Sequence, residues 1–128
     1  MSGQERVVAL ALAEPDAKNP LPIVLAKDGV VVLSYMAFIA LKDQHIIVSF
    51  HTAYEHRFGP PPARAPKAPG GYEVERSAWV RESFGGKGRH YLFVFPDGVF
   101  ECVADGFGAE TVAENEDAVR LMSRRLYK

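Results

Sequence analysis

The stretch from Arg89 to Ala104, RHYLFVFPDGVFECVA, constrains the fold of this chain more than any other feature. Two apolar runs flank Pro96-Asp97-Gly98, and Asp-Gly pairs are typical of tight hairpin turns because both residues tolerate left-handed backbone angles. Tyr91 to Phe95 is apolar at every position, as in an interior strand that is covered on both faces. The pattern predicts a buried β-hairpin at the centre of a small sheet.

Further strands are predicted before this hairpin. Asp28-Gly29 separates two β-branched runs and predicts a second hairpin. The predicted strands are 23–26, 30–38, 45–50 with an extension to 54, and 72–76. The run Val7–Ala13 fits either a strand or a short helix, which Pro15 ends in both cases.

Two helical segments are expected. Ser77 is placed to cap a helical turn over Ala78–Phe84. The clearest helix is predicted over Asn115–Tyr127, where Val119, Met122 and Leu126 share one face. The fold class is therefore α+β, a mainly antiparallel β-sheet of about six or seven strands with one C-terminal α-helix packed on it.

The chain is predicted to form a single globular domain over residues 1–128, a common size for one core. Residues 58–71, FGPPPARAPKAPGG, hold five of the nine prolines, and proline blocks both helix and ladder pairing. This segment is expected to be a surface loop and not a domain boundary, because neither flank is long enough to fold alone.

Charge and cysteine content narrow the classes of function. The net charge of −1 argues against a nucleic-acid partner. No apolar run is long enough to cross a membrane, and the first residues do not resemble a secretory leader. The lone Cys102 cannot form an internal disulfide, so the expected location is cytoplasmic.

Three segments, taken together, resemble an uncharacterised group of small, mostly bacterial proteins. They are Arg57-Phe58-Gly59-Pro60-Pro61, the segment 73–80 with its Ser-Ala-Trp-Val, and the hairpin 89–104 that begins Arg-His and contains Phe-Glu-Cys. Pro62 and Pro96 depart from that pattern, where the group has an amide side chain and a histidine. The resemblance implies a shared fold and no activity.

The histidines, Cys102 and Glu101 are each explained by a structural role, without catalysis or metal binding. His51 and His56 lack the short, repeated spacing of a zinc site, so no metal or other cofactor is predicted. Cys102 shares a strand face with Phe100 and Ala104, and burial would leave its thiol inert. Glu101 lies on the other face, and if it is buried it needs Arg89 or another donor.

Trp79 is the best candidate for a contact residue, because tryptophan and arginine are enriched at interaction hot spots. The leading hypothesis is a non-catalytic binding protein that uses the Pro/Gly-rich loop 58–71 and the Trp79 region. Its partner would be another protein or a second copy of the chain. The candidate binding residues are Arg57, Tyr72, Trp79, Arg81, His56 and His90.

The competing hypothesis is a small hydrolase-like enzyme with a site at the sheet edge. It would use His56, His90, Asp97 and Glu101. It requires at least one histidine and one carboxylate to meet within hydrogen-bond distance in a concave pocket.

Overall fold

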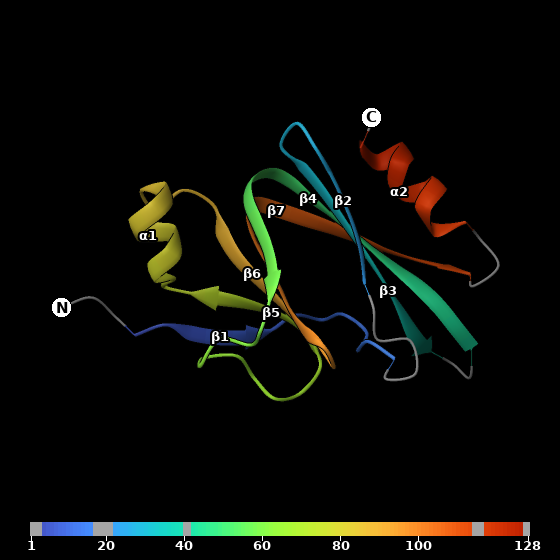
Figure 1. Cartoon of the computed structure of the whole chain (residues 1–128), viewed down its shortest axis with the longest axis horizontal. Helices are drawn as coiled ribbons and strands as arrows, with labels where there is room; N and C mark the ends of the chain where they lie inside the picture. The colour runs from blue at the N-terminus through green and yellow to red at the C-terminus, as the bar shows by residue number, and fades with distance from the viewer. Residues whose placement is uncertain (1–3, 17–21, 40–41, 114–116, 127–128) are drawn as a thin grey trace.

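A computed structural model describes residues 4–16, 22–39, 42–113 and 117–126, which form one antiparallel sheet with two short helices (Figure 1). The order of the seven strands is β1-β5-β6-β7-β4-β3-β2. The strands are β1 Arg6–Ala9, β2 Ile23–Lys27, β3 Val30–Ile39, β4 Lys42–Gly59, β5 Gly70–Glu75, β6 Arg89–Phe95 and β7 Gly98–Ala113; the helices are α1 Ala78–Phe84 and α2 Ala118–Leu126.

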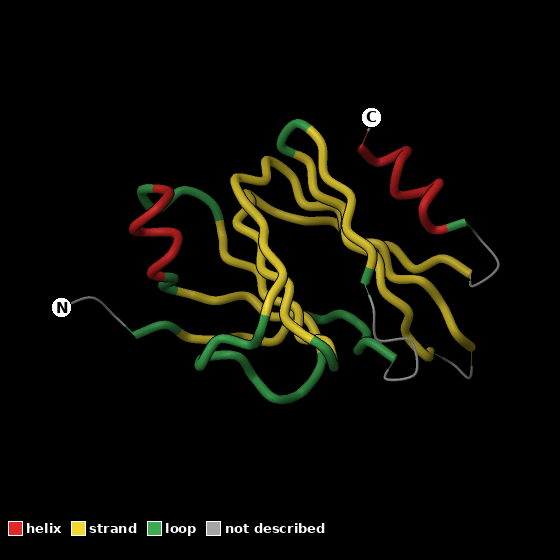
Figure 2. The backbone as a smooth tube through the Cα atoms, viewed as in Figure 1, coloured by secondary structure: helices red, strands yellow, loops and turns green. Residues whose placement is uncertain are grey.

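Strands β4 and β7 form the longest pair of the sheet, which runs from Gln44↔Ala113 to Gly59↔Val99. A bulge between Ala53 and Glu55 interrupts their register, and Thr52 beside it has a positive φ of 51°. Bulges bend strands and increase their twist. On one side of the bend the pair continues into β3 and β2, and on the other into β6, β5 and β1 (Figure 2).

The predicted central hairpin is confirmed. Strands β6 and β7 pair from Arg89↔Ala104 to Phe95↔Gly98, and both have a further strand on their outer side. The Asp28-Gly29 hairpin is also confirmed, with positive φ at both residues (49° and 80°), as a type I′ turn requires.

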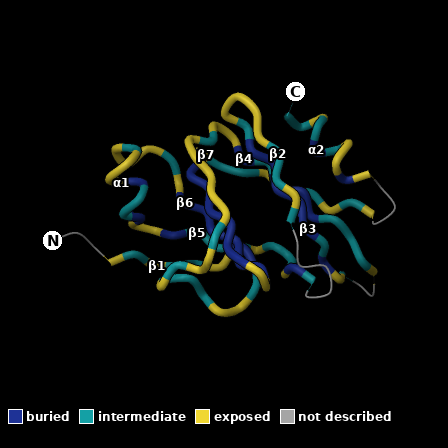
Figure 3. Tube along the Cα trace, in the orientation of Figure 1, coloured by how far each residue is buried: buried dark blue, intermediate teal, exposed yellow. Residues whose placement is uncertain are grey.

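One face of the sheet carries the main core. Its residues alternate along β3, β4, β6 and β7, and they gather at the dark centre of Figure 3. Cys102 is fully buried here as expected, and desolvation raises the pKa of its thiol to about 12. The fully buried aromatic rings of this cluster are Phe50, Tyr91, Phe93 and Phe100.

The opposite face is divided into two smaller clusters by the bend. One cluster contains Val74, Leu92, Val94 and Val99, and Ala65 of the loop between β4 and β5 packs against it. The other contains Val32 and Ile47 with Met122 of α2. The predicted stripe on this helix is wrong at Val119, which is 47% exposed, because the face is formed by Met122 with its neighbours Leu121 and Leu126.

Several predicted boundaries are wrong. The loop predicted over 58–71 is shorter, because β4 continues to Gly59 and β5 begins at Gly70. We call residues 60–69 the proline loop. Strand β7 does not end near Ala104 but continues to Ala113. The predicted helix 115–127 is seen from Ala118 to Leu126, and its residues 115, 116 and 127 lie outside the described part of the chain.

The Val7–Ala13 run forms an edge strand over its first part, with Arg6–Ala9 paired to β5. Leu10, Leu12 and Ala13 then pack against the main core. Neither α1 nor α2 has the length and apolar content that a membrane-spanning helix needs.

Gly71 provides a test of this packing. It lies opposite Phe93, and a Cβ added at Gly71 would come within 2.8 Å of that ring, which is fully buried. We expect Gly71→Ala to lower the free energy of unfolding by about 1–3 kcal/mol, the usual cost of overpacking. Gly59→Ala is the matched control, because its Cβ would meet no atom within 4 Å. Equal denaturation midpoints for the two variants would contradict this packing.

A buried carboxylate cluster

Glu101 lies on the sheet face that carries α1 and the proline loop, because it alternates with Phe100 and Cys102 of the main core. Only 5% of the residue is exposed. A buried carboxylate is costly unless several donors satisfy it. Glu101 therefore determines which side chains must gather around it.

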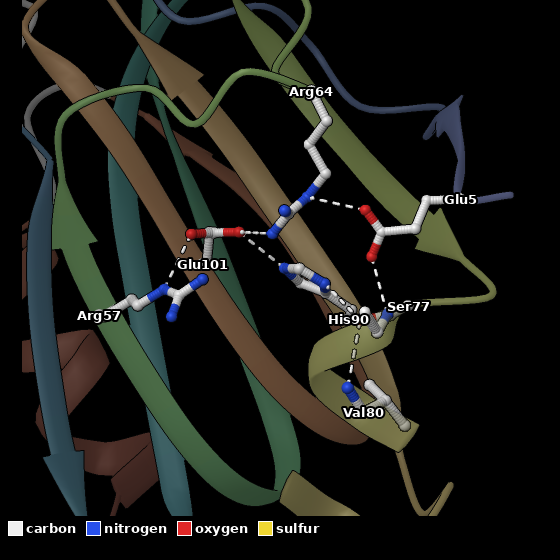
Figure 4. A network of polar contacts seen from close by, with 8 residues as sticks. Glu5, Arg57, Arg64, Ser77, Val80, His90 and Glu101 are labelled. Carbon is white, nitrogen blue, oxygen red and sulfur yellow. Dashed lines mark hydrogen bonds and ion pairs between the residues drawn. The ribbon is translucent and has the colours of Figure 1, made fainter. Parts of the chain in front are cut away.

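Three side chains donate to this carboxylate (Figure 4). The Nε of Arg57, directly opposite on β4, donates to Oε2 at 2.9 Å. The Nη2 of Arg64, from the proline loop, reaches Oε1 at 2.9 Å, and the Nε2 of His90 on β6 lies 2.8 Å from the same oxygen. The sequence predicted that a buried Glu101 needs Arg89 or another donor; Arg89 pairs with Glu73 at 3.7 Å, and the other donors are Arg57, Arg64 and His90.

His90 links the carboxylate to helix α1. It is fully buried, and its Nδ1 lies 2.8 Å from the Oγ of Ser77. That oxygen also accepts the Val80 N–H at 3.2 Å, as the helix cap predicted from the sequence. Because an ionised carboxylate only accepts hydrogen bonds, the Nε2–H of His90 donates to Glu101, and Nδ1 shares a hydrogen bond with the Ser77 hydroxyl.

Trp79 packs against two of the residues that bind Glu101, Arg57 and His90. The Arg57 guanidinium carbon lies 4.1 Å from the centre of the indole ring, in cation–π contact. The ring also meets the edge of His90, with centroids 5.1 Å apart and planes at 81°. We call Arg57, Arg64, Trp79, His90 and Glu101 the Glu101 cluster.

Two residues outside the cluster support it. Glu5, just before β1, accepts the backbone N–H of Ala78 at 2.7 Å and lies 3.6 Å from the Nε of Arg64. Ser77 is almost completely buried between His90 and α1. Neither Glu5 nor Arg64 was expected from the sequence, because only the fold brings them beside Glu101.

The candidate binding residues separate into two groups. Arg57, Trp79 and His90 meet in the cluster. Tyr72 lies on β5, where its hydroxyl donates to the Ala68 carbonyl at 2.8 Å. Arg81 lies on the exposed side of α1.

His56 and Asp97 do not join Glu101. His56 lies opposite Cys102, and its ring packs near Phe100 at 6.1 Å, so it is on the other face of the sheet. Asp97 lies in the turn after Phe95, at the far end of β6 from His90. The four-residue hydrolase site inferred from the sequence therefore reduces to His90 and Glu101.

A groove of about 460 Å³ lies on the α1 side of His90. Its wall includes Ser77 and His90, with Arg76, Arg81 and Arg89 around them. Within the described residues, no group of three histidine, cysteine or acidic side chains is arranged to hold a metal ion.

Comparison of the chain with protein-family models, with curated proteins and with solved structures finds no match.

The pH dependence of stability tests the geometry of the Glu101 cluster. Burial alone would raise the pKa of Glu101, but hydrogen bonds from His90 and Arg57 and their charges lower it from 4.5 to about 2. The ionised carboxylate thus stabilises the folded state above about pH 5, and this contribution, about 3 kcal/mol, disappears as the pH falls towards 2.

We expect Glu101→Gln to lose that part of the acid dependence, measured by urea denaturation across this pH range. The difference between wild type and variant isolates Glu101, because the other carboxylates are common to both. Parallel stability curves for the two proteins would show that the carboxylate is not selectively stabilised.

Proposed function

We propose that this chain is a non-catalytic binding protein that recognises a partner protein through the outer side of the Glu101 cluster and the adjoining proline loop. The observation that carries the proposal is the shared contact of Arg57 and Arg64 with one buried carboxylate, each at 2.9 Å. This contact ties the proline loop to β4 beside Trp79.

The energetic cost of the cluster supports a role beyond stability. A buried ion pair often stabilises a protein no more than apolar residues of the same volume would. The cluster does, however, fix two long side chains and an indole ring before any partner arrives. Preorganised side chains lose less conformational entropy on binding, which strengthens an interface.

The outer side of the cluster has the composition of a contact site. The side chain of Arg57 is 51% exposed, and neither of its Nη groups makes a hydrogen bond with a described residue, so both remain available to an acidic group. The Trp79 ring in contact with it is partly exposed. Arginine and aromatic residues in such proximity are typical of interaction hot spots. The proposed partner therefore presents an acidic side chain next to an apolar one.

A peptide selection tests this surface. Displayed peptides selected on the wild-type protein are expected to be enriched in acidic and apolar residues. Their affinity should fall at least about tenfold for Trp79→Ala and Arg57→Gln, as expected at a hot spot. Arg120→Gln on α2 is the control, because it removes an equal charge from an exposed position far along the fold. Selected peptides that bind all four proteins equally would refute the proposal.

A second candidate is the hydrolase-like activity, favoured by the hydrogen-bonded line from Ser77 through His90 to Glu101 beside the groove. Its geometry differs from that of known triads, in which serine faces Nε2 and the acid faces Nδ1. In addition, the Ser77 oxygen accepts the Val80 N–H, and the hydroxyl is nearly inaccessible.

Ser77→Ala distinguishes the two candidates. We expect the variant to lose about 1–2 kcal/mol of stability with its helix cap. Its rate of p-nitrophenyl acetate hydrolysis should equal that of wild type. A saturable wild-type activity that disappears in folded Ser77→Ala would favour the enzyme.

A further inference from the structure

The second half of β4 forms a free edge of the sheet. Strand β3 pairs with β4 only as far as Val31↔Phe50. Beyond it, the Ala53 N–H donates to the Gly29 carbonyl at 2.7 Å, at the tip of the β2–β3 hairpin. From Tyr54 to Gly59, no strand among the described residues pairs with the side of β4 that faces away from β7. Pro60 has no N–H and ends this edge.

Most residues along this edge are exposed, as the colour of this part of β4 shows in Figure 3. Tyr54 is 39% exposed and Phe58 49%. Glu55 has no hydrogen bond or ion pair with any described residue. An edge with unpaired backbone groups is a template for another strand.

Symmetry limits how two copies of this edge can pair. When two identical antiparallel strands are related by a two-fold axis, one residue must face its own copy, and residues at equal distances on either side face each other. Centring on Glu55 or on Arg57 places like charges directly opposite, which is unfavourable. Centring on His56 places each Glu55 opposite the other copy's Arg57. Of these three registers, only the one centred on His56 places opposite charges across from each other.

We propose that a second copy of this chain pairs with the free edge, antiparallel and centred on His56. The two sheets become continuous across Tyr54–Phe58, and each Glu55 lies opposite the other copy's Arg57, so opposite charges face each other across the new pair of strands. This proposal concerns pairing along the edge of the sheet with a second copy, whereas the proposed function concerns binding of a partner protein to its face.

The other edges of the sheet lack this complementarity. Strand β2 carries Lys27 and no acidic residue. The outer edge of β7 beyond Ala104 carries Glu110, but its carboxylate already accepts two hydrogen bonds from Arg125 at 2.8 Å. On β1, Arg6 lies 3.8 Å from Glu75 of the adjacent strand.

Sedimentation equilibrium over a concentration series tests the self-association. The wild-type protein should reach twice its monomer mass, and Glu55→Arg should remain monomeric because two pairs of like charges then face each other. Glu82→Arg makes the same charge change at an exposed position of α1 and should associate as wild type does. A wild-type protein that stays monomeric, or a Glu55→Arg variant that dimerises normally, would overturn the proposal.

Disulfide cross-linking tests the register on an otherwise unchanged chain. Under mild oxidation His56→Cys should form a cross-linked dimer, because residue 56 faces its own copy. Phe58→Cys should cross-link far less, because each copy of residue 58 faces residue 54. Cys102 is fully buried and will not contribute. Equal cross-linking at both positions would exclude this register. His56→Cys in reducing buffer should still bind the selected peptides, because His56 lies on the opposite face from Trp79. A failure of the proposed contact face and a failure of the proposed strand pairing therefore give different results.

Discussion

The desolvated charge of Glu101 is the constraint on which the arrangement around the site depends. Strand alternation places this carboxylate on an apolar face, where it must find donors or destabilise the fold. The donors come from β4, the proline loop and β6. His90 then needs its own partner, and Ser77 provides it while capping α1. One charge therefore couples segments that are far apart in the sequence, and each contact supports the next.

Local sequence patterns predicted the strands and turns that their own residues specify. They did not predict segments whose conformation depends on the strand with which they pair. The apolar run of β6 and the Asp28-Gly29 turn follow from side-chain chemistry alone. Residues 105–108 contain two glycines and an aspartate, which are typical of a turn, yet they lie within β7. They are extended because β4 pairs with β7 along its whole length. Tertiary pairing overrides local preference in such segments.

The sequence predicted that a buried Glu101 needs a donor, but it did not predict which side chains surround it. Alternation along β7 placed Glu101 away from the main core and implied that it needs a donor. Identifying Arg57 as that donor requires the register Arg57↔Glu101, and identifying Arg64 requires the path of the proline loop. His56 was misplaced because the bulge at Ala53/Glu55 shifts the register and leaves it opposite Cys102. The sequence contains no local signal for that bulge.

Both proposed surfaces lie on the part of β4 that follows its bulge. Strand β3 begins at Val30, so its pairing with β4 ends at Val31↔Phe50, and the residues of β4 beyond the bulge have no described strand on that side. The same residues remain paired with β7 on the other side, which holds Arg57 over Glu101 and Trp79. The Nε of Arg57 donates to Glu101, and its Nη groups make no hydrogen bond with any described residue. The proposed contact face and the proposed strand edge therefore share one short segment of β4, because Arg57 presents its side chain to the face while its backbone lies along the edge.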